Sequence, residues 1–252
     1  MHLDRVMSVL EAVAVAGRGV TAPEVQQATG LPRPTCYRLL QTMAEHRLLD
    51  EPEPGRYLVG ERMIRLSLLG QSDADVCKVA EPTLRDAADQ FGEAVFLSRF
   101  RNQGVEIIQV EVPRNAARSY MHPGLGFRPM HACSCSKVIA AFAEDTFRDH
   151  ILNSPMQSYT PQTKNNPAAV LAEFATIRQA GYAECVEEVE LGVSSVAAPI
   201  RIGNIGATFS IGVTGPIRRF TAAKRQNFGQ ELIGYASKVA VALQMHGGAG
   251  RA

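Results

Sequence analysis

Side chains that can bind phosphate and read base edges gather in one short segment of the chain. Residues 33–41 place such side chains between apolar ones, and the polar set is Arg33, Thr35, Tyr37, Arg38 and Gln41. Arginine, threonine and glutamine donate hydrogen bonds to phosphate oxygens and to base edges. Residues 31–47 contain three arginines and one acidic residue, although the net charge of the whole chain is only +1. The segment predicts a contact with DNA, and the alternative is a protein-docking module whose polar side chains are merely solvated.

A second group of reactive residue types lies near the middle of the chain. His131, Cys133 and Cys135 are close in sequence, and imidazole and thiolate are preferred ligands of zinc. A structural zinc site needs about four ligands, which would make Cys185 the fourth. A nucleophilic cysteine needs a base and an orienting group within hydrogen-bond reach, and adjacency in the sequence supplies neither. A metal- or thiol-responsive sensor built from these four residues is one interpretation of this region.

The sequence contains none of the common enzyme motifs. It has no phosphate-binding glycine loop, no HExxH and no GxSxG. We therefore expect a protein that is not an enzyme and that needs no cofactor. Apolar residues make up 46% of the 252 and charged residues 20%, which favours one or two folded domains over disorder. The five cysteines are scattered, and no long apolar stretch or signal peptide is evident, so we expect a cytoplasmic protein with free thiols.

Three helices and a hairpin are predicted to carry residues 33–41. Apolar residues recur at helical spacing from Leu3 to Ala14, and Gly17 ends this first helix. The Thr21 hydroxyl caps a second helix that ends at Gly30, and a third helix starts near Pro34. Two short apolar runs joined by Pro52–Gly55 form a hairpin. This order describes a winged helix-turn-helix, whose third helix enters the major groove. The predicted DNA-binding set is Thr21, Arg33, Thr35, Tyr37, Arg38, Gln41 and Arg56.

The remainder of the chain mixes helical and strand-like segments, which predicts an α+β fold. Glu61–Gly70 has the pattern of a linker helix. The segments that follow are a helix at 76–91, strands at 94–100 and 105–112, a Pro/Gly-rich turn at 123–126, a helix at 136–143, a loop at 153–166, a helix at 167–180, a hairpin of 196–201 and 207–214 across Gly203 and Asn204, and a closing helix at 221–245. The predicted domains are 1–60, a linker at 61–72, a second domain at 73–246 and a frayed tail at 247–252.

Four motifs in order, the first of them made of two segments, resemble the isocitrate-lyase-regulator (IclR) family of bacterial transcription factors. Residues 21–40 and 55–60 resemble its GLPxSTxxRLL helix and GRYxLG wing. Residues 129–137, 181–199 and 210–216 resemble its PxHATALGKA, GYAxDxEExxxGxxCxAAPV and ALSVSGP segments. The resemblance runs roughly from Leu3 to Val241. It implies a transcriptional regulator of a metabolic operon, with a winged helix-turn-helix followed by a GAF-like effector-binding domain, an antiparallel sheet flanked by helices.

The resemblance also implies where an effector binds. Cys185 stands where many members carry Asp, so an anion would meet less repulsion here, and Ser195 stands where many carry Cys. Hydroxyls and free backbone N–H groups can hold a carboxylate. We therefore expect a small organic acid, and small polar pocket residues favour a glyoxylate- or pyruvate-like 2-oxo acid over an aromatic acid. The implied effector-binding residues are Tyr120, Met130, Ser134, Cys135, Cys185, Ser195, Gly212 and Thr214.

Family architecture predicts an allosteric mechanism. Protomers would pair as a homodimer, or as a dimer of dimers in a homotetramer, and present two recognition helices to a roughly palindromic operator. The effector would bind one conformation of the second domain better and change the spacing of the DNA-binding heads through Glu61–Gly70. Such coupling is typically worth about 1–3 kcal/mol.

Overall fold

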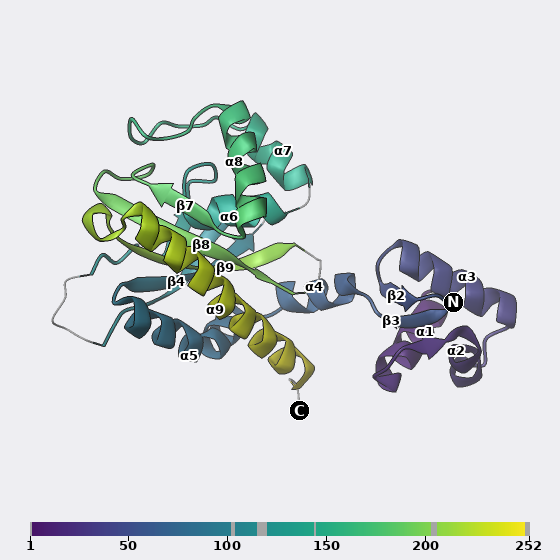
Figure 1. Cartoon of the computed structure of the whole chain (residues 1–252). Coiled ribbons are helices and arrows are strands. Elements are labelled where there is room, and N and C mark those ends of the chain that lie inside the picture. The colour runs from purple at the N-terminus through teal and green to yellow at the C-terminus, as the bar shows by residue number, and fades with distance from the viewer. Residues whose placement is uncertain (1, 102–103, 115–119, 144, 203–205, 250–252) are drawn as a thin grey trace. The chain divides into compact units, whose positions relative to one another are not determined.

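The computed structural model describes residues 2–101, 104–114, 120–143, 145–202 and 206–249. The chain divides into two compact units, one that ends at Gly70 and one that begins at Gln71 (Figure 1). Within the described residues, no helix is long and apolar enough to cross a membrane.

Three helices form the core of the first unit, as predicted: α1 (His2–Ala16), α2 (Ala22–Thr29) and α3 (Arg33–Glu45). Helix α2 begins at a capping interaction, because the Glu24 carboxylate accepts from the backbone N–H of Thr21 at 2.7 Å and from its hydroxyl at 2.8 Å. The helix ends at Gly30, whose φ of 67° is readily adopted by glycine. The three helices pack on a common apolar cluster that includes Val9, Val13, Val25, Cys36, Leu39, Leu40 and Met43.

The predicted hairpin is present as β2 (Leu49–Glu53) and β3 (Arg56–Val59), and a short strand β1 (Val20–Thr21) pairs with β3 on its other side. Two residues are too few to show a strand pattern, which explains why the sequence did not predict β1. Helix α4 (Glu61–Leu69) follows directly after Gly60. A β-carbon at Gly60 would lie only 2.4 Å from the carbonyl oxygen of Arg47, so the close approach to the start of β2 requires glycine.

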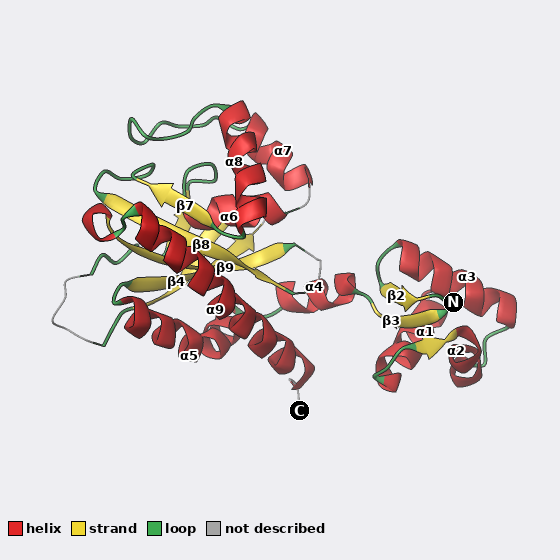
Figure 2. Ribbon diagram, in the orientation of Figure 1, coloured by secondary structure: helices red, strands yellow, loops and turns green. Residues whose placement is uncertain are grey.

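The second unit is built on one antiparallel sheet of six strands in the order β6-β5-β4-β9-β8-β7 (Figure 2). The central pair, β4 and β9, comes from segments more than a hundred residues apart, and it places Phe96 beside Gly212. The strands are β4 (Ala94–Arg101), β5 (Gly104–Glu111), β6 (Gly126–Arg128), β7 (Ala183–Val186), β8 (Val193–Arg201) and β9 (Ala207–Pro216).

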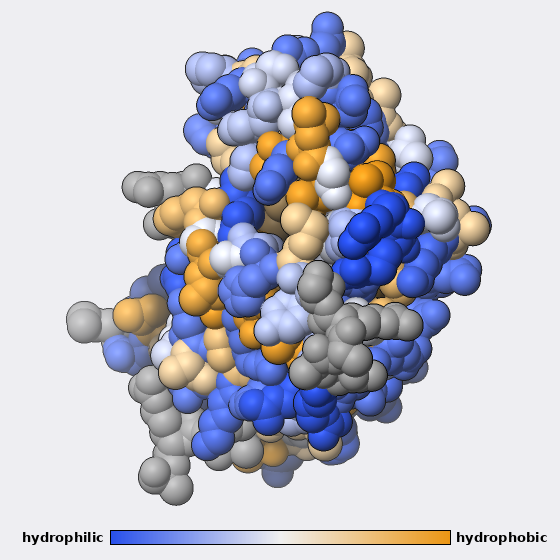
Figure 3. Space-filling view, turned by 90° about the vertical axis from the view of Figure 1, so that its left-hand side faces the viewer, coloured by the Kyte–Doolittle hydropathy of each residue, from blue (hydrophilic) through white to orange (hydrophobic). Residues whose placement is uncertain are grey.

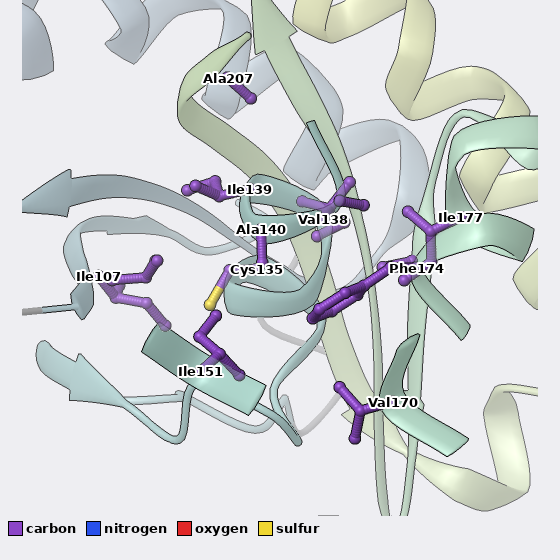
Figure 4. Packing of buried hydrophobic residues seen from close by; sticks show 14 of the residues in the cluster. Ile107, Cys135, Val138, Ile139, Ala140, Ile151, Val170, Phe174, Ile177 and Ala207 are labelled. Carbon is purple, nitrogen blue, oxygen red and sulfur yellow. The ribbon is translucent and has the colours of Figure 1, made fainter. Parts of the chain in front are cut away.

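Helices cover both faces of this sheet, which confirms the α+β prediction. Helices α5 (Asp73–Phe91) and α9 (Ala222–Ala249) pack together on one face, and α6 (Ser134–Phe142) and α8 (Pro167–Ala180) pack on the other (Figure 2). A short 3₁₀ turn (Ile217–Arg219) leads into α9. Under α6, Cys135 lies among apolar side chains such as Ile107, Ile139 and Ile151 (Figure 4). Successive residues of a strand point to opposite faces, so the α6 side receives every second side chain of β4, β8 and β9.

Several segments differ from the sequence prediction. Helix α7 (Asp145–Asn153) and strands β6 and β7 were not predicted. Both strands are short edge strands whose structure depends on pairing with β5 and β8, and pairing leaves no local pattern. The tail expected to fray from residue 247 is helical through Ala249. The predicted turn at Gly203 and Asn204 and the end of the tail from residue 250 lie outside the described residues.

Candidate functional site

The outer face of α3 carries the polar set that the sequence singled out for DNA binding. Arg33, Arg38 and Gln41 are exposed, and the opposite face of the helix is buried. The guanidinium carbon of Arg33 lies 5.5 Å from the ring centroid of Tyr37, a cation–π distance. Arg38 forms no ion pair within the described residues. Its charge is therefore available to a phosphate or a guanine edge.

The two flanking members of the predicted DNA-binding set are partly engaged within the unit. Thr21 donates its hydroxyl to Glu24, so its first role is to cap α2. The Glu24 pKa is lowered to about 2, chiefly by the backbone N–H of Thr21 and by the guanidinium of Arg18. Arg56, on the hairpin, donates to the carbonyl of Gly19 at 3.2 Å and lies 3.5 Å from a carboxylate oxygen of Glu53. About half of its side chain remains exposed. Contacts of these residues with DNA stay predictions.

The second unit contains a cavity on the α6 side of its sheet. Its volume is about 130 Å³. An ordered water needs about 10–15 Å³ on the same measure, so the space suits a ligand of several heavy atoms. The face shown in Figure 3 has hydrophobic side chains in small patches between hydrophilic ones, which is ordinary for a protein surface. The residues around the cavity are Phe96, Ile107, Met121, His122, Pro123, Arg128, Cys133, Cys185, Val189, Glu190, Val193, Ser195 and Thr214.

Three of the predicted effector-binding residues line this cavity directly. They are Cys185, Ser195 and Thr214, which sit at neighbouring positions of β7, β8 and β9. Ser134 lies immediately behind them, because its hydroxyl oxygen is 2.7 Å from that of Ser195. One hydrogen is enough to join the two hydroxyls, so the pair has a second hydrogen to donate to a ligand.

Gly212 shapes the cavity because it has no side chain and leaves space for the ring of Phe96. A β-carbon at this position would lie 2.2 Å from the ring of Phe96 and 2.8 Å from the carbonyl oxygen of Val196. The glycine therefore lets the Phe96 ring approach the backbone of β9 closely, and Phe96, rather than Gly212, lines the cavity.

The other three predicted residues do not line the cavity. Tyr120 is 42% exposed, and its neighbour Met121 supplies the apolar wall instead. Met130 packs against the apolar cluster beneath α6, and Cys135 lies inside that cluster (Figure 4). The backbone explains the last difference, since Cys133 precedes α6 and reaches the cavity, whereas Cys135 is turned inward by the helix.

Sequence reasoning missed Arg128 altogether. It lies on β6 and lines the cavity, where it is the single arginine or lysine among the residues described there. One terminal nitrogen donates to the carbonyls of Pro123 at 2.7 Å and Gly124 at 2.5 Å. Its Nε is buried without a hydrogen-bond partner in the described part of the chain. An arginine directly after a turn rich in proline and glycine was the signal in the sequence, and it was too general to use.

A buried ion cluster holds the wall formed by Val189 and Glu190. The ammonium of Lys137 is fully buried and donates to Glu188 at 2.6 Å and to Glu173 at 2.8 Å. Desolvation raises the pKa of Glu188, and the positive charge of Lys137 opposes that shift. The carbonyl of Glu188 also accepts from the Thr163 hydroxyl at 2.6 Å. The loop before β8 is therefore tied to both α6 and α8.

Cys133 and Cys185 are held as neutral thiols, whereas the pKa of Cys135 is lowered, because its contacts with Cys133 and Ser136 outweigh the effect of its burial. The sulfurs of Cys133 and Cys135 are 3.4 Å apart, and this contact together with burial raises the pKa of Cys133. Desolvation raises the pKa of Cys185 to about 12. A neutral thiol is a poor nucleophile and a poor metal ligand.

The described residues also give the metal-sensing alternative no ligand set. They include no cluster of three or more His, Cys, Asp or Glu side chains that could hold a metal ion. A ring nitrogen of His131 is instead 2.9 Å from the carbonyl oxygen of Gln157.

Models of two known domains match the chain. The IclR helix-turn-helix domain matches residues 2–52, and the C-terminal domain of bacterial IclR transcriptional regulators matches residues 71–241. The second match alone covers more than half of the chain. The chain belongs to the IclR family. Its first unit is therefore a DNA-binding helix-turn-helix domain, and its second is the family's effector-binding domain.

Relatives in the IclR family resemble the chain over most of its length. The glycerol operon regulatory protein of Streptomyces griseus is 29% identical over 221 residues, which are 86% of this chain and 85% of the relative. The transcriptional repressor IclR of Escherichia coli K12 is 26% identical over 243 residues, which are 95% and 89% of the two chains. These relatives are transcriptional regulators and not enzymes.

Solved IclR structures have the same fold. The IclR protein of Thermotoga maritima superposes on this chain with a TM-score of 0.61 at 21% identity. The match covers 96% of this chain and 98% of the Thermotoga maritima chain. An IclR homologue of Microbacterium hydrocarbonoxydans, crystallised with 4-hydroxybenzoate, gives a TM-score of 0.60 at 23% identity over 98% and 100% of the two chains.

Proposed function

We propose that this IclR-family regulator controls a metabolic operon in response to a small organic acid bound in the cavity of its second unit. The observation that carries the proposal is the composition of that cavity. Arg128 supplies a positive charge and Ser195 a hydroxyl, while the one acidic lining residue, Glu190, is exposed to solvent. Cys185, with its raised pKa, adds no negative charge at neutral pH.

Two classes of acid remain candidates, each supported by a different observation. The small polar residues of β7, β8 and β9 support a glyoxylate- or pyruvate-like 2-oxo acid, which stays our first prediction. The cavity volume of about 130 Å³ and the apolar side chains of Phe96, Ile107 and Met121 support a monocyclic aromatic acid. An apolar cavity of roughly 150 Å³ is known to hold benzene, so a single ring fits this space.

Strand β4 offers a physical route from the cavity to the start of the second unit. Phe96 lies in the cavity lining, and Arg99, three residues further along β4, is almost fully buried. Arg99 donates to the carbonyl of Gln71 at 2.9 Å and to the carboxylate of Asp73 at 2.7 Å. Gln71 follows α4 and Gly70 directly in sequence. An effector that shifts β4 would therefore act on the segment that joins the two units.

We propose that protomers pair and that two α3 helices read a roughly palindromic operator. Apolar side chains exposed one helical turn apart on α1 support this pairing, since Leu3 is 67% and Met7 is 43% exposed. Exposed apolar groups on one element are typical of interaction surfaces. Whether the assembly is a dimer or a dimer of dimers is measured directly by light scattering of the full-length protein.

The proposal is tested by calorimetric titration of the full-length protein with glyoxylate, pyruvate, benzoate and 4-hydroxybenzoate. We expect at least one acid to bind with one site per protomer. Tighter binding of glyoxylate or pyruvate supports the first candidate, and tighter binding of the aromatic acids supports the second. Failure of all four, together with binding of a neutral ligand or a metal, would overturn the proposed effector class.

A further inference from the structure

Arg128 is held in a fixed position at one side of the cavity. Both hydrogens of one terminal nitrogen have a carbonyl acceptor, on Pro123 and on Gly124. The same turn is closed by the backbone N–H of Gly124, which donates to Nδ1 of His122 at 3.0 Å. Gly124 has a φ of 74°, a conformation that glycine adopts without strain. The guanidinium is therefore oriented before any ligand arrives.

The remaining hydrogen-bonding capacity of this side chain is left unused. Its Nε lies below the surface, and nothing in the described residues accepts its hydrogen. A buried N–H of a charged group without an acceptor is costly, and native proteins avoid it unless a ligand or water supplies the acceptor. The sheet order places β5, β4 and β9 between β6, which carries Arg128, and β8, which carries Ser195. Apolar side chains of Ile107 and Phe96 lie on the strands between them.

We propose that the guanidinium of Arg128 binds the carboxylate of the effector and makes the cavity specific for a monocarboxylic acid. The inference rests on the proposed function and deepens it, because the family resemblance does not include this residue among the effector contacts. A charge-assisted hydrogen bond to a fixed guanidinium explains the placement of a lone cation in a largely apolar space. The hydroxyls of Ser195 and Ser134 then serve a second polar group of the ligand at the other side of the cavity.

The cavity can pair with only one carboxylate of a ligand. Arg128 is the single cation that lines the cavity within the described residues, and Glu190 adds a negative charge at its exposed edge. A second carboxylate on the ligand would face the neutral Cys185 and Ser195 or the Glu190 carboxylate, without a cation to pair with. Dicarboxylic acids are therefore expected to bind more weakly than monocarboxylic acids of the same size.

The experiment compares the full-length protein with its Arg128→Gln variant by calorimetry. The probe is whichever of pyruvate and 4-hydroxybenzoate binds the parent protein more tightly, and its amide, pyruvamide or 4-hydroxybenzamide, is the matched neutral ligand. We expect Arg128→Gln to weaken binding of the acid by about 10- to 100-fold and to change binding of the amide by less than about 3-fold. Arg178→Gln is the control, since Arg178 donates to Ala141 on the covering helices and does not line the cavity.

The possible outcomes separate this inference from the proposed function. If the acid binds parent and Arg128→Gln proteins equally, the Arg128 contact is wrong while the acid effector stands. If the acid and the amide are weakened alike, Arg128 only holds the turn at Pro123 and Gly124, and the proposal is overturned. If none of glyoxylate, pyruvate, benzoate and 4-hydroxybenzoate binds the parent protein, the acid effector and the Arg128 contact are both refuted. Thermal melting of each variant verifies that the second unit is folded.

Discussion

The two units of this regulator hold their functional groups in opposite ways. On α3 the side chains expected to meet DNA are solvated and lie on one exposed face, with the structural residues on the other. Around the cavity, groups from six strands and three loops meet in a partly buried space, and several of them also hold the fold together. Lys137 is the clearest case, since it supports a cavity wall and is itself fully buried.

This difference has consequences for substitution. A solvated side chain can be removed at little cost in stability, so changes on α3 are expected to affect DNA binding alone. A residue in the buried network is coupled to its neighbours, so changes near the cavity are expected to affect stability and ligand binding together. Four substitutions test whether the two units differ in this way.

The largest effect is expected for Lys137→Met. Removing the ammonium leaves the buried carboxylate of Glu188 without its ion-pair partner and Glu173 with Lys164 alone, and breaking a buried pair in this way typically costs about 3–5 kcal/mol of stability. The measurement is chemical unfolding of the second unit in the full-length protein. Lys164→Met is the matched control, because Lys164 contacts the same Glu173 but is 44% exposed, and it should cost less than about 1 kcal/mol. Equal losses in the two variants would contradict the role assigned to the buried cluster.

Arg38→Ala is expected to weaken operator binding about 10- to 100-fold and to leave the melting temperature unchanged. Each protomer of a pair would lose one contact to phosphate or base, worth roughly 1–3 kcal/mol when it is a base contact. Fluorescence anisotropy over a salt series measures the change. Arg85→Ala, a surface arginine of the second unit paired with Glu81, is the control. Unchanged DNA affinity after Arg38→Ala would contradict the DNA contact assigned to Arg38.

Cys185→Asp is expected to weaken binding of an acidic effector about tenfold and to leave DNA affinity without effector nearly intact. The substitution places a carboxylate in the cavity, where it repels an anion in a partly desolvated site. Calorimetry and anisotropy measure the two quantities separately. Cys185→Ser keeps the position neutral and should bind the acid within about threefold of the parent. If Cys185→Asp and Cys185→Ser behave alike, the cavity does not bind an anion beside this residue.

Asp73→Asn is expected to give a smaller effect that appears only in the coupling between the sites. The substitution weakens the contact of Arg99 with the start of α5. We therefore expect the change in DNA affinity that the effector causes to be about 2- to 10-fold smaller in the variant than in the parent. Effector affinity itself should stay within about twofold. Asp75→Asn is the control, because Asp75 lies in the same helical turn but bonds to Ser72 and not to β4. A loss of coupling in both variants would point to helix capping as the cause.

Local patterns made the first unit and most elements of the second predictable from sequence. The polar face of α3 repeats within a few residues, and the cap at Thr21 and the stop at Gly30 are encoded beside the helix they bound. The cavity could be predicted only in part. Cys185, Ser195 and Thr214 were reached through family resemblance, whereas Phe96 and Arg128 become neighbours of these residues through strand pairing across long stretches of chain.

The direct test of the account is footprinting of the full-length protein on the promoter region beside its own gene, with and without the acid that binds most tightly in calorimetry. The account predicts protection of a roughly palindromic site, and a change in the protein concentration needed for protection when the acid is added. A promoter left unprotected at every concentration, both with and without the acid, would contradict it.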